Sequence, residues 1–80
     1  MKYIIFKGFA GNPVPIIFPP RIMHDEMREQ LPYSQVLSAG YVSLGPDGFA
    51  CHGASKALGL SAAEGDAEIM ARFFAPDAED

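Results

Sequence analysis

The sequence predicts an α+β domain with two helices packed on one face of a small, mainly antiparallel sheet of four or five strands. Three observations lead to this class. Short apolar runs bounded by glycine and proline indicate strands, a glycine-proline turn joins two of them, and two segments have apolar residues at helical spacing. We expect a single domain over residues 1–76, followed by an acidic, disordered tail, Asp77–Asp80.

The first two strands are predicted from apolar runs that do not alternate with polar residues. Tyr3–Lys7 opens with four consecutive β-forming residues, and Val14–Phe18 is apolar along its whole length. Such runs are typical of strands that are covered on both faces. Since proline cannot donate to a hydrogen-bond ladder, Pro15 places the second strand at a sheet edge or at a bulge.

The turn Gly45–Gly48 predicts a hairpin between Ser38–Leu44 and Phe49–Ala54, with positive φ at Gly48. If all four turn residues form the loop, one hairpin face is apolar: Val42, Leu44, Phe49 and Cys51. The other face then carries Tyr41, Ser43, Ala50 and His52. A three-residue loop would mix the two faces and lose apolar burial, so the four-residue loop is favoured.

Two helices complete the pattern. Met23–Gln30 has an apolar stripe of two methionines and Leu31, and Pro32 closes it. The second helix is predicted over Ala62–Ala75, because Ser61 and Glu64 match a capping box and Pro76 follows. The segment before it, residues 55–60, could form a fifth strand or an irregular connection.

Composition excludes several classes of function. The net charge is −4 and there is no basic run, which argues against nucleic-acid binding. The apolar run at the N-terminus is too short for a signal peptide or a membrane span, so we expect a cytoplasmic protein without a membrane partner. One cysteine allows neither an internal disulfide nor a four-cysteine zinc site.

Four residues are the candidates for a chemical site: Tyr41, Cys51, His52 and His24. Neighbours on a strand point to opposite faces, so the adjacent Cys51 and His52 diverge. A cysteine nucleophile would therefore need His24, and a metal site would need both histidines with Cys51 at a spacing that matches no known ligand pattern. We accordingly predict no catalytic, cofactor-binding or metal site, and take Cys51 as an apolar packing residue.

Most of the chain resembles a group of small bacterial and prophage-type proteins with no established activity. The likeness lies in five short segments: residues 17–19 followed by His24, then 38–42, 51–55, 58–60 and 66–70. It implies a bacterial or phage origin and carries no site residue to this chain.

The functional expectation is a non-enzymatic protein-interaction module that forms a homodimer. Hydrophobic residues make up 49% of the chain, and two helices on one face would leave either Tyr3 and Ile5 or Ile4 and Phe6 uncovered. The alternatives are a small enzyme or metal-binding protein that uses Cys51 with a histidine, and a module that binds a host or phage protein through its acidic surface.

Overall fold

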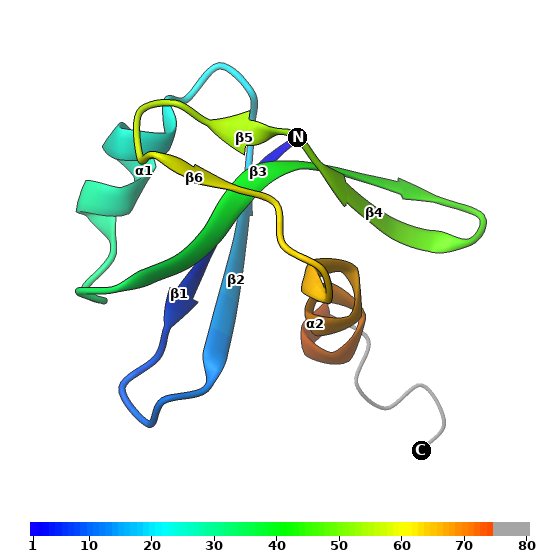
Figure 1. The fold of residues 1–80 in the computed structure, drawn as a ribbon, viewed down its shortest axis with the longest axis horizontal. Helices are drawn as coiled ribbons and strands as arrows, with labels where there is room; N and C mark the ends of the chain where they lie inside the picture. Colours follow the sequence, from blue (N-terminus) through cyan, green and yellow to red (C-terminus); the bar gives the residue numbers. More distant parts are fainter. Residues whose placement is uncertain (75–80) are drawn as a thin grey trace.

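The computed structural model describes residues 1–74, which form a four-stranded sheet, a two-stranded sheet and two helices (Figure 1). The large sheet contains β1 (Lys2–Lys7), β2 (Pro13–Phe18), β3 (Val36–Gly45) and β4 (Gly48–His52). The remaining elements are α1 (His24–Gln30), β5 (Ala54–Ser55), β6 (Leu60–Ser61) and α2 (Asp66–Phe74). The predicted α+β class is confirmed. The predicted helix end at Pro76 and the acidic tail lie outside the described residues.

The large sheet is antiparallel throughout, with the strand order β2-β1-β3-β4. Its edge strand β2 contains Pro15, as the missing donor of proline predicts. The long strand β3 is shared, because its first half pairs with β1 and its second half with β4. Tyr41 marks the change, since it lies opposite both Lys2 and His52. Beyond that point the hairpin projects from the body of the sheet (Figure 1).

The two helices cover opposite faces of the sheet, and the prediction that both lie on one face is wrong. Met70 of α2 packs with Tyr3 and Ile5, whereas Met27 of α1 packs against the cluster on the other face. That second cluster consists of Ile4, Phe6, Phe18 and Ala39, and it is also covered by Leu58 and Leu60 from the small sheet. The unalternating apolar run of β1 predicted cover on both faces, because a strand with apolar residues on both faces needs a covering layer on each face.

This arrangement removes the premise of the predicted dimer. Residues Tyr3, Ile4, Ile5 and Phe6 are all 0% exposed within one chain. Neither face of β1 is left for a partner to cover, because the chain supplies α2 for one face and α1 with β5 and β6 for the other. Any self-association must use a different surface.

The predicted hairpin register is confirmed. Val42 lies opposite Cys51, Leu44 opposite Phe49, and the ladder extends to the pair Gly45 and Gly48. Gly48 has a φ of 105°, as expected for the end of this turn. The apolar face of the hairpin therefore lies on the α2 side of the sheet, where Val42, Phe49 and Cys51 join the Tyr3 cluster.

The strand that follows the turn is shorter than predicted, because Gly53 interrupts it. Its φ of 79° turns the chain between β4 and β5, and a β-carbon there would lie 3.0 Å from the Tyr41 ring. Residues 54–55 then pair with residues 60–61 to form the small sheet, which packs on the α1 side of the large sheet. The ambiguous segment 55–60 is thus a short hairpin of its own, outside the main sheet.

The last helix begins at Asp66 instead of Ala62. Gly65 has a φ of 95°, which no helical residue adopts, so a helix cannot run through it. The predicted Ser61–Glu64 capping box is not among the hydrogen bonds of the described residues; instead the carboxylate of Asp66, the first helical residue, accepts the backbone N–H of Ala63 at 2.9 Å in the turn before the helix. Within the described part of the chain, neither helix has the length and apolar character needed to cross a bilayer.

Candidate functional site

Tyr41 is the centre of an aromatic row on the α1 side of the sheet. Its ring is stacked on His52, with centroids 6.1 Å apart, and meets the edge of His24 at 5.9 Å. His24 is 4% exposed, and its Nε2 lies 3.0 Å from the Gly40 carbonyl. Because a carbonyl only accepts, that nitrogen carries the proton and donates. The structure thus brings together three of the four residues singled out in the sequence.

A pocket of about 230 Å³ opens beside this row. It lies between the start of β1, the start of α1 and the turn that joins β5 to β6. Its lining is Lys2, Met23, His24, Tyr41, Ala54, Ser55, Lys56 and Ala57. Lys2 reaches it because β1 alternates, so that Lys2 shares the face of Ile4 and Phe6.

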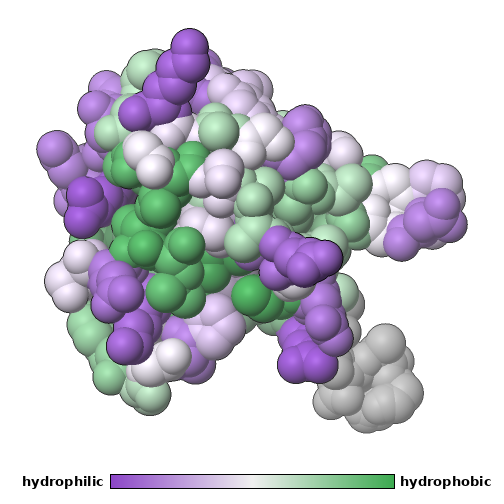
Figure 2. Space-filling model, viewed as in Figure 1, coloured by the Kyte–Doolittle hydropathy of each residue, from purple (hydrophilic) through white to green (hydrophobic). Residues whose placement is uncertain are grey.

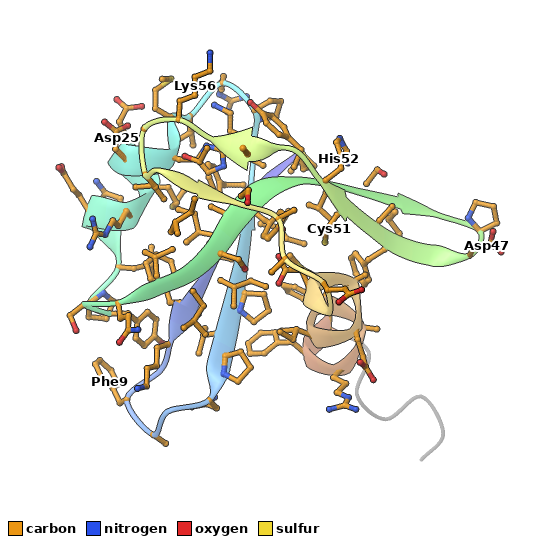
Figure 3. All side chains as sticks on the ribbon, in the orientation of Figure 1. Phe9, Asp25, Asp47, Cys51, His52 and Lys56 are labelled. Carbon is orange, nitrogen blue, oxygen red and sulfur yellow. The ribbon has the colours of Figure 1, made fainter. Side chains whose placement is uncertain are left out.

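Cys51 lies on the other face of the sheet, away from both histidines. Figure 3 shows the side chains of Cys51 and His52 on opposite sides of β4. Cys51 is half-buried against the Tyr3 cluster, whereas His24 and His52 flank Tyr41. The alternative of a cysteine–histidine site therefore finds no support in the geometry. Among residues 1–74 no group of three metal-ligating side chains occurs.

A buried polar cluster occupies the α2 side of the sheet, and its centre is Asp66. This side chain is 3% exposed. It accepts the Tyr3 hydroxyl at 2.5 Å, the Ser38 hydroxyl at 3.0 Å and the Ala63 N–H at 2.9 Å. All three partners donate, as an ionised carboxylate requires. The cluster therefore ties α2 to β1 and β3, and its burial leaves no route for a substrate.

The environment of this cluster changes two acidities. Burial, and then the hydrogen bond to Asp66 and its negative charge, raise the pKa of the Tyr3 hydroxyl far above its ordinary value of 10.0. Burial and the Asp66 charge also raise the pKa of the Cys51 thiol. A hydrogen bond with Tyr3 lowers this pKa and so offsets part of the increase. A thiol that stays protonated is a poor nucleophile, so Cys51 acts as a packing residue.

These shifts predict that the fold is destabilised by alkali. The unfolded chain releases the Tyr3 proton near its ordinary pKa of 10.0, while the folded chain keeps it. The contribution of the Tyr3 hydroxyl to the free energy of unfolding is therefore fully present below pH 10. Above pH 10 it falls by about 1.4 kcal/mol per pH unit. Urea unfolding of the wild type between pH 8 and pH 11.5 should show this decline, with a slope of about that size.

The variant Tyr3→Phe should decline less steeply above pH 10, because it lacks the buried proton, although it is less stable at neutral pH. Tyr33→Phe is the matched control, since it leaves the Tyr3–Asp66 pair intact. Identical pH slopes for the wild type and Tyr3→Phe would contradict the prediction.

The projecting hairpin carries Leu44, the most exposed of the large apolar side chains in the sheet. Leu44 is 70% exposed and Met1 is 54% exposed, and both line a shallow pocket whose floor includes Val42 and Phe49. The ring of Phe74, at the end of α2, lies 6.1 Å from that of Phe49. We name these residues the hairpin surface: Met1, Val42, Leu44, Phe49 and Phe74.

A second apolar area is visible in Figure 2, over the start of β3 between α1 and β6. Its side chains are half-buried and belong to the cluster around Ile4: Leu31, Val36, Leu58 and Leu60. It is the outer side of a packed layer. The hairpin surface differs, because Leu44, near the tip of the projecting hairpin, is 70% exposed.

Sequence reasoning missed Lys2, Ser55 and Lys56 of the pocket, and Tyr3, Ser38 and Asp66 of the buried cluster. Only Lys2 had a usable signal, since alternation along β1 places it with Ile4. The others come together through turns at Gly53 and Gly65 whose direction a sequence does not reveal.

Comparison of the chain with protein-family models, curated proteins and solved structures found no match. The resemblance to small prophage-type proteins stays a prediction.

Proposed function

We propose that this chain is a protein-interaction module that associates with a second copy of itself through the hairpin surface. The observation that carries the proposal is Leu44, which is 70% exposed on an arm that projects from the sheet. Exposed apolar side chains next to one another are typical of interaction sites. Here Leu44, Met1 and Phe49 adjoin one shallow pocket.

The open edge of β4 supports a second copy as the occupant. β4 is the last strand of the sheet, and among the described residues only β3 pairs with it. An unpaired strand edge accepts another strand, and a twofold pair of identical edges is self-complementary. The opposite edge, β2, contains Pro13 and Pro15 and is poorly suited to such pairing. Two hairpins paired along β4 would place their Phe49 side chains on the two strands that meet, with Leu44 one strand behind on the same apolar face.

Charge supports a contact at this place as well. The chain has 10 acidic residues against 6 basic ones, so two copies repel over most of their surface. None of the five side chains of the hairpin surface is charged; the one charge there is the N-terminal ammonium of Met1, which donates to the Val42 carbonyl at 3.2 Å. A cytoplasmic location fits the proposal, since the one cysteine is a free thiol.

The variant Leu44→Glu tests the proposal. Wild type should sediment at twice its 8.6 kDa mass at high micromolar concentration, and Leu44→Glu should sediment as a monomer. The side chain is 70% exposed, so the substitution should leave the fold intact. We expect dimer affinity to fall at least about tenfold, which corresponds to the loss of about 1.4 kcal/mol.

Leu37→Glu is the matched control. It makes the same change in the same strand, at a residue that is 43% exposed and lies outside the hairpin surface. It should remain dimeric. A folded wild type that stays monomeric at several hundred micromolar would refute self-association and leave a host or phage protein as the partner to seek.

A further inference from the structure

The pocket beside Tyr41 has a basic character that the rest of the chain lacks. Two lysines, Lys2 and Lys56, line it, together with His24 and no carboxylate. The chain as a whole has a net charge of −4. Positive charge is therefore concentrated where the surface is concave, an arrangement that focuses the electrostatic field on a small anion.

Lys2 is the decisive residue of this pocket. It is 8% exposed, and its ammonium donates one hydrogen bond, to the Ile22 carbonyl at 2.9 Å. Among residues 1–74 no carboxylate lies within 4.0 Å of it, since the single ion pair found there joins Arg72 to Glu68. Buried charges are normally paired, and an ammonium group has three donors. Lys2 thus has two donors left and no counter-charge.

Ser55 offers a further donor. It is 3% exposed, and its hydroxyl oxygen accepts the backbone N–H of Leu58 at 3.2 Å. This bond uses the oxygen as an acceptor, which leaves the hydroxyl proton available to donate. Lys56 follows directly and is exposed at the turn between β5 and β6 (Figure 3). Its flexible stem lets the ammonium group approach a molecule bound in the pocket.

We propose that this pocket binds a small oxyanion, the carboxylate or phosphate group of a small molecule. Lys2 supplies the buried counter-charge, Ser55 a neutral donor and Lys56 a second cation from the rim. The Tyr41 ring and the Met23 side chain, which also line the pocket, provide an apolar wall for the remainder of the molecule. A volume of about 230 Å³ suits a molecule of this size and excludes a folded partner.

The experiment titrates the ¹⁵N-labelled protein with sodium phosphate, and separately with sodium acetate, at constant ionic strength set with sodium chloride. Constant ionic strength removes general screening from the comparison. We expect saturable shifts at the amides of Tyr41, Ser55 and Lys56, with a dissociation constant on the order of millimolar, or about −4 kcal/mol. The probe with the lower dissociation constant identifies the preferred oxyanion.

Three variants decide the assignment. Lys2→Met keeps the buried stem but removes the charge, and should weaken binding at least about tenfold, in keeping with the loss of a charge-assisted hydrogen bond. Lys56→Gln, at an exposed site that the fold does not need, should weaken it severalfold. Lys7→Gln is the matched control, because Lys7 is an exposed lysine of the same strand outside this pocket.

A thermal readout separates binding from a structural role of Lys2. Phosphate or acetate, whichever binds, should raise the melting temperature of wild type and not that of Lys2→Met, since only a ligand of the folded state stabilises by mass action. If Lys2→Met does not fold, the titration of Lys56→Gln against Lys7→Gln decides. No saturable shift up to 50 mM of either probe, or equal weakening in Lys7→Gln, would overturn the proposal.

Discussion

Ile4→Glu and Ile5→Glu should each unfold the protein. Both side chains are 0% exposed, and they point to opposite faces of β1. Each substitution removes a large apolar group, which costs about 2–5 kcal/mol, and forces a carboxylate into an apolar cluster. At 0.05–0.15 kcal/mol per residue, a chain of this length has only about 4–12 kcal/mol of stability. Circular dichroism at 25 °C should show an unfolded chain in both cases.

The two variants test the fold because the sequence alone predicted different outcomes for Ile4→Glu and Ile5→Glu. If both helices lay on one face, one of the two isoleucines would face outward, and its substitution would dissociate a dimer without unfolding the chain. Leu37→Glu is again the control, since that leucine is 43% exposed and should tolerate the change. A folded Ile4→Glu or Ile5→Glu would show that one layer of the fold does not form in solution.

The parts of the fold that sequence predicted are those that local rules determine. The hairpin follows from the turn at Gly45–Gly48 and from the alternation around it, and its register is the observed one. Pro15 places β2 at an edge because proline has no backbone N–H to donate to a second neighbouring strand. The packing of Met27 and Leu31 likewise follows from their spacing of four residues, whereas Met23 of the predicted stripe precedes α1 and is 52% exposed.

The parts that it missed depend on the direction of the chain at single glycines. Gly53 turns the chain onto the α1 side of the large sheet, where the small sheet forms and supplies one wall of the pocket. Gly65 delays α2 so that Asp66 becomes its first residue and points into the core. A glycine permits either sign of φ, so the sequence reveals that a turn is allowed and not where it leads. The pocket around Lys2 and the cluster around Asp66 were therefore beyond prediction.

Asp66→Ala should be among the most destabilising substitutions on the α2 side. It would leave the Tyr3 and Ser38 hydroxyls buried without an acceptor, and it would release the Ala63 N–H in the turn before the helix. Each unsatisfied buried group costs about 1–3 kcal/mol, so we expect a total loss of about 3–5 kcal/mol. Urea unfolding followed by circular dichroism at pH 7 measures it.

Two comparisons make this prediction specific to the cluster. Asp25→Ala removes a carboxylate from the exposed first turn of α1 and should cost less than about 1 kcal/mol, as expected for a surface charge near a helix N-terminus. The double variant Tyr3→Phe with Asp66→Ala should be less destabilised than the sum of the single variants, because Tyr3→Phe removes one of the donors that Asp66→Ala leaves unpaired. Simple additivity, or a cost for Asp66→Ala no greater than that for Asp25→Ala, would mean that the buried carboxylate does not hold α2 against the sheet.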